Sequence, residues 1–180
     1  MDYRDRGERT SQAQILDSRE NRAQRQKELI KRYGVAVVSF TMNIPGEIKS
    51  SPSIKSVFAD GLEAVTAALL QNHAEILFFE SRYLPTGPEA FFCVSRPAAE
   101  IKKLLCTIEE GHKAGRLFDI DVIGTDFLKI SRSDIGLKPR RCLLCGCEAV
   151  LCARGRRHDR EELADKISRI ISECMGEKEL

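Results

Sequence analysis

The sequence predicts an α/β or α+β domain in which helices flank a mixed β-sheet. Segments with the apolar spacing of helices alternate along the chain with short runs rich in β-branched and aromatic residues, and such interleaving is typical of this class. The 180 residues suffice for one full core, and neither an internal repeat nor a long linker divides them. We therefore expect a single domain over residues 11–180, preceded by a flexible polar N-terminus, residues 1–10.

The first part of the chain alternates between helix and strand. Apolar residues at helical spacing predict a helix over Ser11–Tyr33, and Gly34 suits its end. The β-branched run Val35–Met42 predicts a buried strand. A turn-forming stretch follows, and helical spacing resumes over Ile54–Gln71, where Gly61 weakens the helical pattern.

The middle and the end of the chain continue this alternation. Residues 76–80 and 90–95 predict two strands joined by a loop over residues 81–89, and Pro97 suits the first turn of a helix that runs to residue 110. The last helix is expected to begin near Asp159, a good N-cap. Its apolar stripe comprises Leu163, Ile167, Ile170, Ile171 and Cys174.

The stretch Gly115–Val122, GRLFDIDV, places two carboxylates in what otherwise reads as a buried strand. Because strand side chains alternate between faces, Asp119 and Asp121 share one face. Two like charges so close repel, and burying them is costly unless a cation or hydrogen-bond donors compensate. Such a pair can hold Mg²⁺ together with substrate phosphates, and Arg116 can grip a phosphate nearby. The alternative is a hydrated polar face on an edge strand.

Residues 140–158, RRCLLCGCEAVLCARGRRH, combine cysteines with arginines. Cys142 and Cys145 form a C-x₂-C knuckle, and Cys152 and His158 follow at spacings that could close a tetrahedral Zn²⁺ site. Cys147 would be the spare cysteine. The alternative is a set of reduced cysteines without metal.

The same region is basic. Residues 132–160 contain eight basic side chains, most of them arginine, and only three acidic ones. This density of positive charge favours an anionic partner over a merely solvated face. On the first predicted helix, Arg19, Arg22 and Gln26 share one face, which either lines a polyanion pocket or is an ordinary hydrated stripe.

Cysteine usage and apolar content bear on the cellular compartment. Seven cysteines, four of them within Cys142–Cys152, predict a reducing cytoplasm rather than a secreted disulfide scaffold. The start of the chain has no apolar secretory signal, and no apolar run approaches the roughly 20 residues that cross a membrane. We expect a cytoplasmic protein without a membrane partner.

Five segments together resemble the CitX family, the apo-citrate lyase phosphoribosyl-dephospho-CoA transferases, also called holo-citrate lyase synthases. They are DSRENRAQRQKELI, FTMNIPGEIK, GPEAFFCV, GRLFDIDV and RRCLLCGCEAVLCARGRRH, in this order, and the resemblance runs from about Leu16 to Ile171. It implies a nucleotidyltransferase-like fold with a small Cys/Arg-rich C-terminal segment, residues 138–158. It also implies transfer of phosphoribosyl-dephospho-CoA from triphosphoribosyl-dephospho-CoA to a serine of the citrate lyase acyl carrier (gamma) subunit, with release of pyrophosphate.

Combined with the reaction that the resemblance implies, the residue patterns predict roles for individual residues. Asp119 and Asp121 would hold Mg²⁺ against the attacked phosphate, and Arg116 would steady the leaving pyrophosphate. A third carboxylate is expected on a neighbouring strand, and Glu80 and Asp126 are the two candidates for it. Candidates for binding the other donor phosphates are Arg19, Arg22, Lys49, Arg140, Arg141, Arg154, Arg156 and Arg157.

Two rival functions fit part of the sequence. A Cys₃His knuckle flanked by arginines could bind RNA or single-stranded DNA without catalysis. However, the Arg-rich stretch lacks the interleaved aromatic residues that base stacking needs, so nucleic acid is not the expected partner. The second rival is a purely structural zinc subunit of a larger assembly. Neither explains two carboxylates in a strand.

Overall fold

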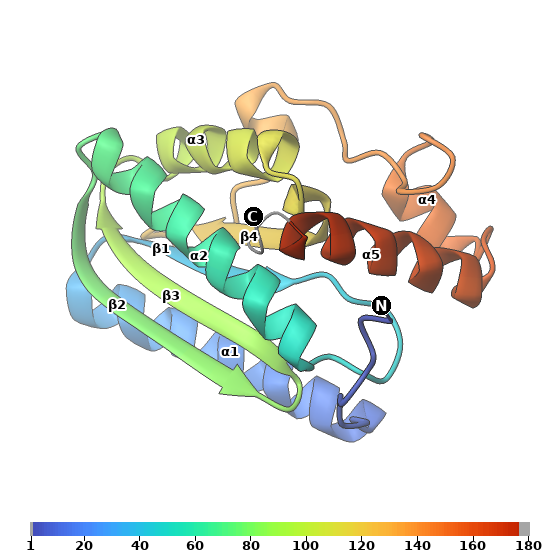
Figure 1. The fold of residues 1–180 in the computed structure, drawn as a ribbon. Helices are drawn as coiled ribbons and strands as arrows, with labels where there is room; N and C mark the ends of the chain where they lie inside the picture. Colours follow the sequence, from blue (N-terminus) through green and yellow to red (C-terminus); the bar gives the residue numbers. More distant parts are fainter. Residues whose placement is uncertain (1, 177–180) are drawn as a thin grey trace.

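The computed structural model describes residues 2–176, which form a four-stranded sheet covered by helices on both faces (Figure 1). The strands are β1 (Ala36–Met42), β2 (Glu75–Leu84), β3 (Gly87–Ser95) and β4 (Phe118–Ile123), in the order β2-β3-β1-β4. The α+β class is confirmed. The sheet differs from the expected mixed sheet, because all three strand pairs are antiparallel.

The two faces of the sheet carry different layers of helix. Figure 1 shows α2 (Pro52–Gln71), α3 (Ala98–Gly111) and α5 (Arg160–Met175) on one face, and α1 (Gln12–Tyr33) on the other. The three-helix face holds the larger apolar core, with Phe40, Phe92 and Phe118 fully buried. The smaller core beneath α1 comprises Leu29, Ile30, Val37, Phe91, Cys93 and Ile123.

Sequence signals account for where the helices begin and end. Ser11 caps α1 through a capping box with Gln14, and Gly34 ends the helix at a left-handed φ of 65°. Ser51 caps α2, whose first residue is proline. Gly61 in α2 is required by packing, because a Cβ there would lie 2.6 Å from Phe118 and 2.7 Å from Phe40.

The expected loop over residues 81–89 is instead part of a long hairpin. β2 extends to Leu84 and β3 begins at Gly87, so only two residues connect the strands. Gly87 has a φ of 113°, which favours glycine. The composition of β2 hid the end of this strand, because burial alternates along it and half of its side chains are exposed.

Residues 2–10, expected to be flexible, pack against the rest of the domain. Tyr3 is 3% exposed, its carbonyl accepts a hydrogen bond from Ser51 Oγ at 2.6 Å, and Thr10 N–H donates to the carbonyl of Glu47 at 2.9 Å. After β4 the chain returns only briefly to the sheet, through one bridge between Ile123 and Lys129. Within residues 2–176, no helix combines the length and the apolar character that crossing a membrane requires.

Candidate active site

Asp119 and Asp121 lie on one face of the edge strand β4, as the alternation predicts. In the register with β1, Asp119 lies opposite Thr41 and Asp121 opposite Ser39. Both carboxylates are half-buried, while Phe118, Ile120 and Val122 point into the core on the other face. The pair therefore occupies the α1 side of the sheet.

Electrostatics make this pair costly for the chain. Burial, and after it the charge of Asp119, raise the pKa of Asp121 above its ordinary value. Lys129 acts in the opposite direction, since its Nζ lies 2.5 Å from Asp121 Oδ1. Lys129 comes from the loop after β4, and its side chain is 56% exposed. The carboxylate pair thus attracts a cation from its own chain.

A third carboxylate shares a row with Asp119. Thr41 lies opposite Asp119 on one side and opposite Glu89 of β3 on the other, so the three residues cross the sheet on one face. Glu89 is 3% exposed and pairs with Arg22 at 3.0 Å and Arg82 at 3.8 Å. Its signal in the sequence is a single acid in the apolar run GPEAFFCV.

The two carboxylates first considered for this position lie elsewhere. Glu80 is on the outer strand β2, where it binds Arg25 at 2.8 Å and Arg82 at 2.6 Å. Asp126 lies in the loop after β4 and accepts a hydrogen bond from the Leu128 amide. Glu89 is therefore the carboxylate that the sheet register aligns with Asp119.

Helix α3 covers the free edge of β4 between the two aspartates. Ile120 N–H donates to Glu109 Oε1 at 3.1 Å, and the Ile120 carbonyl accepts from Lys102 Nζ at 2.6 Å. Arg132 binds the other oxygen of Glu109 at 3.0 Å, and Arg140 binds Oε1. Because Glu109 and Lys102 are both buried, this network fixes the backbone between Asp119 and Asp121.

A basic cavity of about 360 Å³ opens beside this edge. Arg116, Arg132, Arg140 and Arg141 line it, and the Arg116 guanidinium donates to the Arg141 carbonyl. Burial, followed by the charges of Arg140 and Arg132, lowers the pKa of Arg116. This edge cavity suits an anion, because its positive charges lack enough carboxylates to balance them.

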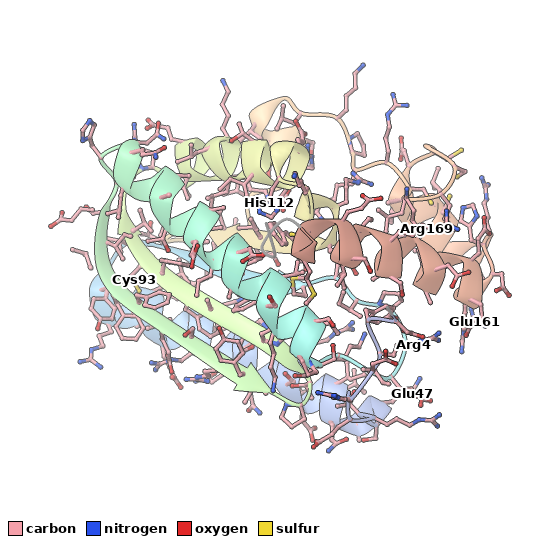
Figure 2. All side chains as sticks on the ribbon, in the orientation of Figure 1. Arg4, Glu47, Cys93, His112, Glu161 and Arg169 are labelled. Atoms are coloured by element: carbon pink, nitrogen blue, oxygen red, sulfur yellow. The ribbon has the colours of Figure 1, made fainter. Side chains whose placement is uncertain are left out.

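A larger cavity of about 850 Å³ lies between the start of α1, the segment 43–49 and the start of α5. Arg19 and Lys49 line it together, and burial followed by the charge of Arg19 lowers the pKa of Lys49. Ile15 and Leu16 add apolar wall. Arg4, Glu47 and Glu161 belong to the lining of this N-terminal cavity, and Figure 2 shows their labelled side chains at the same end of the molecule.

The other predicted basic residues are divided among different surroundings. Arg22 forms an ion pair with Glu89 and does not line the N-terminal cavity. Arg154, Arg156 and Arg157 are exposed around the end of α4 (Ala149–Arg154). The arginines and lysine considered from the sequence therefore form three groups, one at each cavity and one around α4, with Arg22 apart from all of them.

The structure brings together Cys142, Cys145, Cys152 and His158. One potential ligand atom from each lies within 4.8 Å of all the others. The sulfurs of Cys145 and Cys152 are 3.5 Å apart. Cys147 is outside this group, as the spacing predicts.

A half-buried carboxylate pair on an edge strand can hold a divalent cation, and arginine- and lysine-lined cavities in the same domain suit phosphate groups. These features fit a transferase of the kind that the family match defines. Residues 10–174 match the family described as CitX, apo-citrate lyase phosphoribosyl-dephospho-CoA transferase. The chain therefore belongs to the CitX family.

Curated relatives agree with this membership. A protein of Vibrio cholerae serotype O1 (strain M66-2), named "Probable apo-citrate lyase phosphoribosyl-dephospho-CoA transferase", is 40% identical over 155 residues, covering 86% of this chain and 87% of the relative. Proteins named "Apo-citrate lyase phosphoribosyl-dephospho-CoA transferase" from Escherichia coli O1:K1 / APEC and Shigella boydii serotype 18 are each 35% identical over 160 residues, covering 89% of this chain and 87% of each relative.

Proposed function

We propose that this protein attaches the phosphoribosyl-dephospho-CoA prosthetic group to apo-citrate lyase. The donor is triphosphoribosyl-dephospho-CoA, and the acceptor is a serine of the acyl carrier (gamma) subunit. The serine oxygen bonds to the phosphorus nearest the ribose, the bond from that phosphorus to the pyrophosphate breaks, and the serine proton is released. The observation that carries the proposal is the shared face of Asp119 and Asp121, in a chain that belongs to this family.

Asp119 and Asp121 would hold Mg²⁺ at this site. Their oxygen atoms are ligands that Mg²⁺ prefers, and the contact between Asp121 and Lys129 supports a position that favours cations. The ion would supply positive charge to the attacked phosphate and to the leaving pyrophosphate. Glu89 lies level with Asp119, but Arg22 and Arg82 compensate its charge, so the metal would be bound by the aspartate pair alone.

The two basic cavities divide the rest of the donor between them. Arg116, Arg140 and Arg141 at the edge cavity would hold the pyrophosphate through charge-assisted hydrogen bonds. Arg19 and Lys49 would bind a second phosphate of the donor in the N-terminal cavity. The volume of that cavity is in the range of cofactor sites, and its apolar wall suits the uncharged part of the donor.

The acceptor protein supplies the nucleophile, so this chain needs no activated serine or cysteine of its own. Arg154, Arg156 and Arg157 form an exposed basic surface around the end of α4. Such a surface would steer an acidic carrier protein towards the site and raise the rate of association. Arg22, held by Glu89, would position α1 over the sheet rather than contact the donor.

The rival function as a nucleic-acid-binding module gains no support. The segment 140–158 contains no Phe, Tyr or Trp on which bases could stack. The carboxylates on β4 would moreover repel a phosphate backbone that arrived without a metal ion. We also place the reaction in the cytoplasm, where thiols such as those of Cys142–Cys152 stay reduced.

A reconstituted reaction tests the proposal. The protein is mixed with the apo-carrier subunit, triphosphoribosyl-dephospho-CoA and Mg²⁺, and the carrier is analysed by intact-mass spectrometry while released pyrophosphate is assayed. The carrier should gain the mass of one phosphoribosyl-dephospho-CoA unit for each pyrophosphate released, and a carrier whose acceptor serine is replaced by alanine should gain none. An unmodified wild-type carrier after complete incubation would contradict the proposal.

A further inference from the structure

We propose that Cys142, Cys145, Cys152 and His158 bind one structural Zn²⁺ ion. Their potential ligand atoms all lie within 4.8 Å of one another. A tetrahedral zinc ion with Zn–S bonds of about 2.3 Å holds its sulfurs roughly 3.8 Å apart. The 3.5 Å separation of the Cys145 and Cys152 sulfurs is close to that value. The four side chains thus already approximate a coordination shell.

His158 provides independent evidence for a bound ion. Among the side chains of residues 2–176 that are not exposed, its Nε2 is the one buried nitrogen or oxygen atom without a hydrogen-bond partner. Buried polar atoms are almost always paired, since leaving one unpaired costs free energy. A metal ion bound by this nitrogen would remove the cost, and a ring nitrogen of His158 lies within 4.8 Å of the three sulfurs.

The backbone around the cluster has the form of a metal-binding knuckle. Cys142 N–H donates to the Cys147 carbonyl at 2.6 Å, and Gly146 makes the turn between them at a φ of 70°. The Leu144 amide points at Cys142 Sγ from 3.5 Å, as amides do when they stabilise a thiolate ligand. Helix α4 then presents Cys152 from the other side.

The ligand set selects both the metal and its role. Three thiolates and one imidazole suit Zn²⁺ and do not suit Mg²⁺, which requires oxygen. Four protein ligands fill a tetrahedral site and leave no position for substrate, which is the mark of a structural rather than a catalytic zinc ion. Cys147 is exposed and outside the cluster, so it serves as an internal control.

The zinc site would also steady the edge of the catalytic strand, a consequence that rests on the proposed function. Arg140 and Arg141 immediately precede the knuckle. Arg140 binds Glu109, which accepts the Ile120 amide between the two aspartates, and the Arg141 carbonyl accepts the Arg116 guanidinium. Closure of the knuckle around zinc would therefore hold the edge cavity in place.

Metal analysis of the purified full chain tests the site. Protein expressed without added metal and purified without chelator should contain about one equivalent of zinc, measured by inductively coupled plasma mass spectrometry. The zinc content of Cys145→Ser should be at least tenfold lower than that of the wild type, whereas Cys147→Ser should retain the wild-type content. Less than about a tenth of an equivalent in the wild type, or equal zinc in both variants, would overturn the proposal.

A second measurement on the wild-type chain covers the case in which Cys145→Ser fails to fold. Replacement of the bound metal by Co²⁺ should give the intense visible absorption of a tetrahedral thiolate site. A colourless cobalt protein would overturn the proposal. Zinc content and cobalt colour do not depend on transferase activity, so this proposal and the proposed function can fail separately.

Discussion

Lys129 Nζ lies 2.5 Å from Oδ1 of Asp121, so a cation from the chain itself occupies one side of the carboxylate pair. This contact offsets part of the repulsion between Asp119 and Asp121, which burial would otherwise make more costly. Because the Lys129 side chain is 56% exposed and comes from a loop, it can leave without disturbing the core. Lys129 would therefore compete with the proposed Mg²⁺ ion for the same carboxylate.

Replacing Lys129 should strengthen metal binding. We expect Lys129→Met to raise the Mg²⁺ affinity of the free protein about twofold to fivefold, since an exposed ion pair contributes up to about 1 kcal/mol. Titration calorimetry with MgCl₂ measures this affinity. Lys166→Met, an exposed lysine on α5, should leave it unchanged, and a weaker affinity for Lys129→Met would contradict competition.

The glycine inside α2 should be irreplaceable, in contrast to one at the end of α3. A Cβ at Gly61 would lie 2.6 Å from the Phe118 ring and 2.7 Å from the Phe40 ring. We expect Gly61→Ala to destabilise the domain by about 1–3 kcal/mol through overpacking. Gly111→Ala meets nothing within 4 Å and should stabilise it slightly. Thermal unfolding of both variants decides, and equal stability would refute the packing argument.

The ion pair beneath α1 should contribute more than its more exposed neighbour. Arg22→Ala would leave Glu89 buried with only Arg82, 3.8 Å away, and should cost about 3 kcal/mol. Arg25→Ala, one turn further along α1, removes the ion pair with Glu80. The side chains of Arg25 and Glu80 are each about a quarter exposed. That change should cost about 1 kcal/mol or less. Urea unfolding compares the two, and a larger loss for Arg25→Ala would reverse this ranking.

Local features of the site could be predicted from the sequence. Alternation along a strand is set by the backbone, so GRLFDIDV alone is enough to place Asp119 and Asp121 on one face. The grouping of Cys142, Cys145, Cys152 and His158 also follows from spacing, because a hairpin and one short helix bring these residues together within 17 positions of chain. Gly34 and the start of the last helix at Asp159 follow from capping chemistry.

Relationships between distant segments could not be predicted in this way. Arg22 lies on the same predicted helix face as Arg19, yet Glu89 from a strand 67 positions away pairs with it. Glu109 of α3 gathers Arg132 and Arg140, and nothing in its own helix indicates that role. The antiparallel sheet order likewise depends on which strands meet, a choice that interleaved helices and strands leave open.

The most direct test of the role of the carboxylate pair is the rate of prosthetic-group transfer by Asp121→Asn, measured beside Asp165→Asn. Asp165 is an exposed aspartate on α5, so both substitutions remove one carboxylate. Asp121→Asn should keep a melting temperature near that of the wild type, because it removes a repulsion as well as an ion pair, and should lose at least about 100-fold in rate. Asp165→Asn should transfer at the wild-type rate. Transfer by folded Asp121→Asn at the wild-type rate would contradict the proposed metal-binding role of the pair.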